Sequence, residues 1–150
     1  GSTIIYVLKR DDCEYTCGIL KNISLNALPY HAGLTPKKRD EIHTKFKNGS
    51  IKIVVATIAF GMGIDKSDVR TIIHYGLPKS LIGYYQQTGR AGRDGNESKC
   101  YLYWTEGDLN MQRYFISKSV TQTGKDKLIQ DSNTIKNYIY SNKCRQQIIL

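Results

Sequence analysis

The sequence predicts an α/β fold of three layers, in which an open, mostly parallel sheet carries helices on both faces. Short β-branched apolar runs alternate with segments of helical periodicity along most of the chain. The run at residues 51–56, IKIVVA, is apolar enough to be buried on both faces, which favours the central strand of a parallel sheet. Since 40% of the 150 residues are hydrophobic, the chain has the length and the core of one domain.

Five strands and five helices are expected in alternation, each bounded by a local signal. Thr35 and Pro36, for example, supply an N-cap and a first helical residue. Strands are expected at residues 3–8, 25–31, 51–56, 69–75 and 98–104. Helices are expected from Asp11 or Asp12 to about residue 22, from Pro36 to Asn48 with Ile42 and Phe46 inward, from Lys79 or Ser80 into an arginine-rich stretch, and at 106–117 and 126–150.

The domain boundaries follow from composition. Residues 1–2, Gly-Ser, look like a cloning remnant, and residues 3–118 form the main lobe. Residues 119–125 are polar with one glycine and are expected to be a linker before the helical residues 126–150. Because the first strand begins almost at once, we expect a neighbouring domain upstream.

The composition favours an anionic partner and a reducing compartment. A formal charge of +9 and a pI near 9.4 are typical of proteins that bind nucleic acid. The four cysteines show no C-x-x-C spacing and too low a density for a disulfide scaffold, which indicates an intracellular protein. No apolar run approaches the roughly 18 residues of a membrane span, so no membrane partner is expected.

The most distinctive stretch is residues 84–95, YYQQTGRAGRDG, which sets Arg90 and Arg93 among three glycines. Glycines leave the backbone little side-chain cover, and a guanidinium can bind two phosphate oxygens at once. The stretch follows a helix at a strand's carboxyl edge, where open sheets bind their ligands. It predicts a phosphate clamp, although a solvated basic loop has the same composition.

The loop after the central strand, residues 57–67, has the sequence TIAFGMGIDKS and only part of a dinucleotide-binding fingerprint. Gly61 and Gly63 fit the first two glycine positions, but Lys66 occupies the third. The chain also contains no G-x-x-x-x-G-K-[ST] phosphate loop. A domain with paired arginines and no phosphate cradle fits an arginine finger, which completes a nucleotide site built elsewhere.

Four segments resemble the motifs of superfamily two helicases, and specifically of RecQ-family DNA helicases. IIYVLKRDDCE at residues 4–14 is similar to motif IV, and YHAGL at residues 30–34 to the segment that follows it. Residues 54–80, VVATIAFGMGIDKSDVRTIIHYGLPKS, resemble motif V, and YYQQTGRAGRDG resembles motif VI. The chain's HYG and QIIL strings look more like Werner-type members. The resemblance implies the second RecA-like lobe of a two-lobe motor.

The resemblance also implies roles for individual residues. Arg93 would be the arginine finger and Arg90 a second phosphate-facing arginine. The implied cofactor-binding residues are Asp65, Gln86 and Gly63. The implied contacts to the backbone of a single DNA strand are Thr57, Lys9, Arg10 and His31.

The family resemblance further implies an ATP-dependent 3′ to 5′ DNA helicase with roles in DNA repair and recombination. ATP with Mg would be bound mainly by a first lobe outside this chain, so the fragment alone would be inactive. Cys144 would be the first zinc ligand, with the other ligands beyond Leu150. The location would be nuclear in a eukaryote, and otherwise the cytoplasm or nucleoid.

Three departures from the family pattern leave alternatives open. Gln87 stands where the family usually has glutamate, Ser67 where it has proline, and Lys9 where it has serine or threonine. The alternatives are the matching lobe of an RNA helicase and a non-catalytic module that binds nucleic acid. Four residues could also have a purely structural role. His31 could cap a strand end, Thr57 could bond to the backbone, Asp65 could cap a turn and His74 could be packed in a strand.

Overall fold

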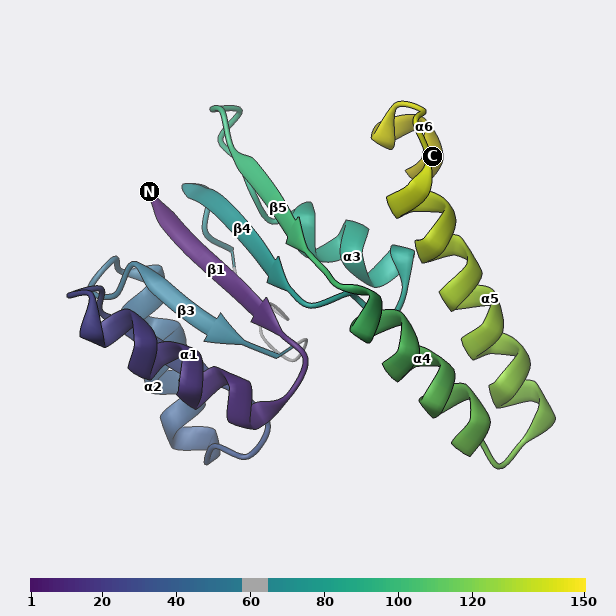
Figure 1. The fold of residues 1–150 in the computed structure, drawn as a ribbon. Coiled ribbons are helices and arrows are strands. Elements are labelled where there is room, and N and C mark those ends of the chain that lie inside the picture. The colour runs from purple at the N-terminus through teal and green to yellow at the C-terminus, as the bar shows by residue number, and fades with distance from the viewer. Residues whose placement is uncertain (58–64) are drawn as a thin grey trace.

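A computed structural model describes residues 1–57 and 65–150 of the chain (Figure 1). Its centre is a five-stranded sheet with the order β2-β3-β1-β4-β5, in which every neighbouring pair is parallel. The strands are β1 (Ser2–Val7), β2 (Ala27–Tyr30), β3 (Ile53–Ala56), β4 (Val69–Tyr75) and β5 (Lys99–Tyr103). The predicted parallel α/β sheet is confirmed.

Six helices accompany this sheet in the described residues. They are α1 (Arg10–Asn22), α2 (Pro36–Lys47), α3 (Leu81–Thr88), α4 (Glu106–Lys118), α5 (Gln122–Tyr140) and α6 (Arg145–Ile149). The start of α2 agrees with its sequence signal, because the Thr35 hydroxyl accepts a hydrogen bond from the Lys38 amide at 3.2 Å. The predicted inward residues of α2, Ile42 and Phe46, are fully buried.

The two faces of the sheet are covered by different helices, because successive side chains of a strand point to opposite faces. On β1, Ile5 and Val7 pack in a cluster with Cys13 of α1. Ile4 packs on the other face in a cluster with Phe46 of α2. Figure 1 shows α1 and α2 beside the half of the sheet that contains β1 and β3. The three predicted layers are therefore present.

The helices after β5 form a separate packed layer at the end of the sheet. Figure 1 shows α4 and α5 as a pair beyond the carboxyl end of β5. Leu77, Leu109 and Ile135 form a small buried cluster that joins the start of the α3 segment to α4 and α5. This cluster couples the helical extension to the edge of the sheet that carries α3.

Two expectations about the sheet need correction. The central strand is β1, and β3 lies between β2 and β1. The apolar run at residues 51–56 indicated burial on both faces, which every interior strand shares, so it did not specify the position. In addition, Ser2 is buried and opens β1, so the strand includes a residue expected to lie outside the lobe.

Three expectations about helices also need correction. The N-cap of α1 is Lys9, whereas Asp11 and Asp12 lie in the first turn, where carboxylates favour the positive end of the helix dipole. The expected linker at residues 119–125 is mostly helical, since α5 begins at Gln122 after its N-cap Thr121. The expected helix at 126–150 ends at Tyr140, and the short helix α6 follows.

Candidate nucleotide and nucleic-acid site

The arginine turn follows α3, which begins as the sequence predicts. The Ser80 hydroxyl accepts a hydrogen bond from the Gly83 amide at 3.1 Å and caps the helix. Past the end of α3, Gly92 has φ +64, and a Cβ there would come within 2.7 Å of the Ser98 hydroxyl. Gly92 is therefore required by the turn itself, because both its conformation and its close approach exclude a side chain.

The turn lies at the opposite end of β4 from the predicted one. The Gly92 amide donates to the carbonyl of Val69, the first residue of β4, at 3.0 Å. Because α3 runs back along the sheet from the carboxyl end of β4, its own carboxyl end returns to the start of that strand. The expectation that the whole arginine stretch sits at the carboxyl edge is wrong for this part of the turn.

Arg90 is half-buried and reaches the carboxyl half of the sheet. Its guanidinium is hydrogen-bonded to the phenol of Tyr6, a β1 residue that is 3% exposed. Burial raises the pKa of Tyr6 to about 12, and the neighbouring Arg90 charge and hydrogen bond partly oppose that shift. At neutral pH the phenol therefore stays protonated.

A pocket of about 290 Å³ opens beside Arg90. It brings together three of the residues expected from the family resemblance, Thr57, Gln86 and Arg90. The other lining residues come mostly from the carboxyl ends of β1 and β4 and from the α3 segment, namely Tyr6, Val7, Leu8, His74, Gly76, Pro78, Lys79, Ser80, Gly83, Tyr84 and Gln87. The pocket thus lies where an open parallel sheet binds its ligands.

Gln87, whose role the sequence left open, is buried against the sheet. Its Oε1 lies 2.6 Å from Nε2 of His74, and both residues are less than a tenth exposed. Burial lowers the pKa of His74, and the hydrogen bond with Gln87 opposes part of that shift. His74 is therefore a packed, neutral histidine at pH 7, and the packed reading of this residue is confirmed.

Arg93 lies on the exposed side of the turn beside Asp65. Its Nη1 is 3.8 Å from Oδ1 of Asp65, and the two side chains are 41% and 91% exposed. An ion pair of this length and exposure contributes little to stability, about 0 to 1 kcal/mol. Arg93 is thus placed near a predicted nucleotide-binding carboxylate without being fixed by it.

The backbone of the turn is held from the other side by Asp94. Its Oδ1 accepts a hydrogen bond from Nη2 of Arg70 at 2.5 Å, and Nη1 of Arg70 donates to the Glu97 carbonyl at 3.0 Å. The hydrogen bond from Arg70 lowers the pKa of Asp94 to about 2. These bonds anchor the turn to the start of β4 and leave Arg93 on its outer surface.

The predicted nucleic-acid contacts gather at the carboxyl ends of β1, β2 and β3. The thiol of Cys13 lies 3.8 Å from the carbonyls of both Lys9 and Tyr30, which joins the ends of β1 and β2. The Thr57 amide donates to the Tyr30 carbonyl at 3.2 Å, which adds the end of β3. Lys9 and Arg10 are exposed there.

His31, the fourth of these residues, has both ring nitrogens engaged inside the chain. Nδ1 accepts a hydrogen bond from the Gly33 amide at 3.1 Å, so Nε2 carries the proton toward Glu14 Oε1 at 3.2 Å. Its side chain is 11% exposed. This geometry is that of a histidine that orders the end of a strand, and a contact with a phosphate stays a prediction.

The structure does not test the predicted roles of Gly63 in cofactor binding and of Cys144 in zinc binding. Gly63 lies outside the described residues, as does Gly61. Cys144 is exposed at the start of α6, and the described part of the chain contains no group of three or more potential metal ligands. A zinc role for Cys144 therefore stays a prediction. In the described residues no helix is long and apolar enough to cross a membrane.

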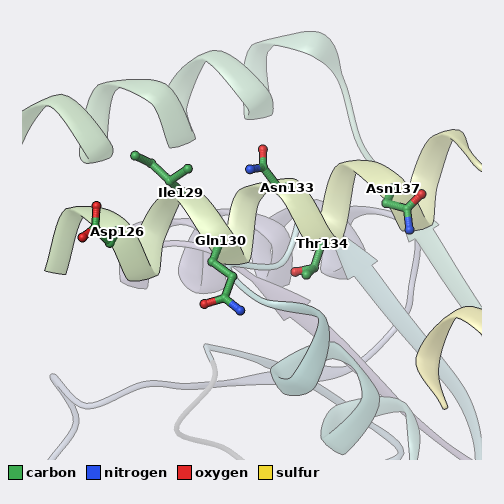
Figure 2. Close-up of a pocket in the computed structure, with 6 residues that line it drawn as sticks. All are labelled: Asp126, Ile129, Gln130, Asn133, Thr134 and Asn137. Carbon is green, nitrogen blue, oxygen red and sulfur yellow. The ribbon is translucent and has the colours of Figure 1, made fainter. Parts of the chain in front are cut away.

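A second hollow, of about 400 Å³, runs along the surface of α5 (Figure 2). Its side chains are spread along the helix rather than converging on one point. They are Asp126, Ile129, Gln130, Asn133, Thr134 and Asn137. The set contains no cation and one carboxylate, which does not fit a phosphate ligand.

The structure adds residues that the sequence did not single out for the site. Tyr6 is one of several tyrosines in the chain, and its contact with Arg90 joins strand β1 to a turn far along the sequence. The alternation of β1 places Tyr6 on the same face as Ile4, and that was the available signal. Which side chain it would meet depends on strand order, which the sequence alone did not provide.

Comparison with known proteins agrees with this geometry. Residues 1–95 match the family of the helicase conserved C-terminal domain. Residues 1–95 are more than half of the chain, so the chain belongs to this family. Among solved structures, a DEAD box protein from the hyperthermophile Methanococcus jannaschii has a TM-score of 0.65 and 26% identity, over 75% of this chain and 31% of that one. The expected RecA-like helicase lobe is thereby confirmed.

Curated relatives identify the branch of the family. The chain is 45% identical over 141 residues to the RecQ-like DNA helicase BLM of Xenopus laevis, and 40% identical over 150 residues to the exonuclease and ATP-dependent helicase WRN of Mus musculus. These matches cover 93% and 100% of this chain but 10% and 11% of those proteins. The expected resemblance to RecQ helicases is confirmed.

One relative is named as a helicase of RNA rather than of DNA. An Acanthamoeba polyphaga mimivirus protein named as an ATP-dependent RNA helicase is 44% identical over 149 residues, which are 99% of this chain and 27% of that protein. The chain therefore spans about a quarter or less of the length of these relatives. Within that length it matches the C-terminal helicase lobe of RecQ-type helicases.

Proposed function

We propose that this chain is the second motor lobe of an ATP-dependent DNA helicase, in which Arg93 acts as an arginine finger. One observation carries the proposal: Arg93 is exposed on a braced turn beside Asp65, in a chain that lacks a phosphate loop. An exposed arginine on a fixed backbone can reach a phosphate held by another lobe. Removing such an arginine lowers hydrolysis by about 10³ to 10⁵-fold.

The residues present fit a nucleotide from one side. Arg90 Nε is buried and has no hydrogen-bond partner among the described residues, as is also true of Arg39 and Arg70. Of these three, Arg90 lines the 290 Å³ pocket. Bound ATP with Mg would supply the transferring phosphate, Arg93 would approach its oxygens and Arg90 would face them from the pocket side. Asp65 would release Arg93 when the lobes close.

The two ends of the sheet carry residues suited to two different ligands, the nucleotide and the nucleic acid. Asp65 and Arg93 lie toward the amino end of β4, whereas Lys9 and Arg10 lie past the carboxyl end of β1. Thr57, after β3, also lines the pocket beside Arg90. Cationic side chains at strand ends bind phosphates of a nucleic-acid backbone without reading its sequence. Closing and reopening of two lobes would then move the grip on a single strand in the 3′ to 5′ direction. The fragment alone would be inactive.

The assignment of Arg93 is tested with Arg93→Ala in the full-length protein. We expect ATP hydrolysis stimulated by single-stranded DNA to fall by about 10³-fold or more, with DNA binding retained. The matched control is Arg113→Ala, because Arg113 is an exposed arginine of α4 that contacts Asn110 of the same helix at 3.0 Å. Near-normal hydrolysis by Arg93→Ala would sink the finger assignment.

A second candidate is a lobe that works on RNA, which the name of the mimivirus relative favours. The names of the other two relatives favour DNA. Hydrolysis measured with single-stranded DNA and with RNA of the same sequence separates the two functions. We expect the larger stimulation with DNA, and stronger stimulation by RNA would contradict a DNA helicase.

The nuclear location, the first lobe as partner, and the use of Mg and Zn are parts of the same proposal. They rest on the RecQ-type relatives, whose named examples include animal helicases. A full-length protein in which chelation of Mg leaves ATP hydrolysis unchanged would remove the metal from this account.

A further inference from the structure

We propose that Tyr6, His74 and Gln87 are positioning residues that set the direction of the Arg90 guanidinium. The inference rests on the proposed function, in which Arg90 faces a phosphate. It concerns three buried residues from β1, β4 and α3, in which Tyr6 contacts Arg90, His74 contacts Tyr6 and Gln87 contacts His74.

The first contact is between Arg90 and Tyr6. The phenol of Tyr6 is hydrogen-bonded to the guanidinium, and the residue is 3% exposed. Because the phenol belongs to the middle strand of the sheet, its oxygen is a fixed point on a rigid element. A guanidinium held at one corner has fewer orientations, so less order has to be created when a phosphate arrives.

The second contact fixes the ring of Tyr6. It stacks on the imidazole of His74 with ring centroids 5.1 Å apart and an angle of 23° between the planes. The edge of Tyr84 closes the other side of His74, at 4.8 Å and 61°. Such aromatic pairs are directional, so they restrict rotation of the Tyr6 ring in addition to filling space.

The third contact fixes the imidazole. Nε2 of His74 lies 2.6 Å from Oε1 of Gln87, an acceptor, so the Nε2 proton points toward α3. Gln87 is 8% exposed and lies three residues before Arg90 on the segment that carries it. The contacts therefore form a closed path from Arg90 through Tyr6 and His74 back to the segment that bears Arg90.

The experiment uses the full-length protein and measures kcat and KM for ATP in saturating single-stranded DNA. Tyr6→Phe keeps the ring and removes the hydroxyl, and we expect kcat to fall on the order of 10-fold with KM within about 2-fold. Gln87→Leu should lower kcat by a similar factor. Gln87→Glu should keep most of the wild-type kcat, because a carboxylate also accepts the hydrogen bond from Nε2 of His74. The matched control is Tyr101→Phe, because Tyr101 is 41% exposed on the edge strand β5.

The outcomes separate the inference from the function on which it rests. Unchanged kcat in Tyr6→Phe or in Gln87→Leu overturns the inference, as does an equal loss in Gln87→Leu and Gln87→Glu. Arg90→Ala is measured in parallel. If Arg90→Ala loses activity while Tyr6→Phe does not, the positioning role fails and the function stands. If Arg90→Ala retains activity, the phosphate-facing role of Arg90 fails first.

Discussion

The two arginines of one turn have opposite surroundings. Arg90 is half-buried, lines a pocket and is bonded to a phenol of the central strand. Arg93, three residues later, is 41% exposed and lies 3.8 Å from a carboxylate that is itself 91% exposed. The difference indicates that Arg90 is placed by the fold of this chain, whereas Arg93 is left to be placed by what it meets. A two-lobe motor needs both kinds of arginine.

The surroundings of each arginine explain the contrast in physical terms. The path from Tyr6 through His74 to Gln87 is buried, and its contacts are made inside the chain, with Nε2 of His74 bonded to Gln87. The backbone near Arg93 is instead fixed by Asp94 and Arg70, which act on the turn and not on the Arg93 side chain. The Arg93 side chain makes exposed contacts, a hydrogen bond from Nε to the Gly89 carbonyl at 3.5 Å and the 3.8 Å ion pair with Asp65, so a phosphate can compete for it.

The largest expected difference in stability is between Arg90→Ala and Arg93→Ala. Loss of Arg90 removes the buried interaction of its charged guanidinium with the Tyr6 phenol, and a hydrogen bond to a charged group contributes about 1 to 3 kcal/mol of unfolding free energy. Loss of Arg93 removes an exposed, long ion pair and should change that free energy by less than about 0.5 kcal/mol. Urea unfolding of both variants measures the contrast. Equal effects would show that the two arginines are held alike.

A smaller effect is expected at the other end of the Arg90 path, in Gln87→Glu. A carboxylate in place of the Gln87 amide, whose Oε1 lies 2.6 Å from Nε2 of His74, would stabilise the imidazolium and raise the pKa of His74. The groups that face this imidazole are Tyr6 from β1 and Tyr84 and Gln87 from α3. NMR titration of the histidine resonances in both proteins measures the change.

The same substitution should change the acid sensitivity of folding. In the wild-type chain burial lowers the pKa of His74, so the folded state takes up its proton less readily than the unfolded state. Stability from this group is present above the unfolded pKa of about 6.5 and is lost as pH falls through the folded pKa. The loss should be smaller in Gln87→Glu. An unchanged or steeper acid loss would contradict a neutral His74 partnered by Gln87.

The smallest effect is expected from Asp65→Asn on the Arg93 side. The ion pair is exposed and 3.8 Å long, so the unfolding free energy should stay within about 0.5 kcal/mol of wild type. Thermal unfolding of this variant next to Arg90→Ala gives the comparison. A loss as large as that of Arg90→Ala would mean that Asp65 holds Arg93 in place, and the contrast between the two arginines would disappear.

Much of the fold was predictable because local signals agree with it. Thr35 caps α2 and Ser80 caps α3 as their sequence positions indicate, and the apolar runs became strands. Strand order was not predictable in the same way, and β1 rather than β3 is central. The order depends on crossovers whose packing is tertiary, and hydrophobic runs report burial without reporting neighbours.

The candidate site was predictable in part for the same reason. Glycine spacing marked the arginine turn, and Gly92 does require a left-handed conformation. The sequence did not separate Arg90 from Arg93, because both are arginines in one basic stretch. Their difference comes from Tyr6, a residue of the first strand that meets the turn only after the sheet has formed.

The measurement that tests the central contrast most directly is the split between nucleotide affinity and hydrolysis in Arg93→Ala. In the full-length protein, the dissociation constant of a non-hydrolysable ATP analogue should stay within about 3-fold of wild type, while single-turnover hydrolysis falls by about 10³-fold or more. That result is expected of an arginine recruited only in the transition state. An affinity that falls as steeply as the rate would show instead that Arg93 is a standing part of the nucleotide-binding site, and would contradict the account.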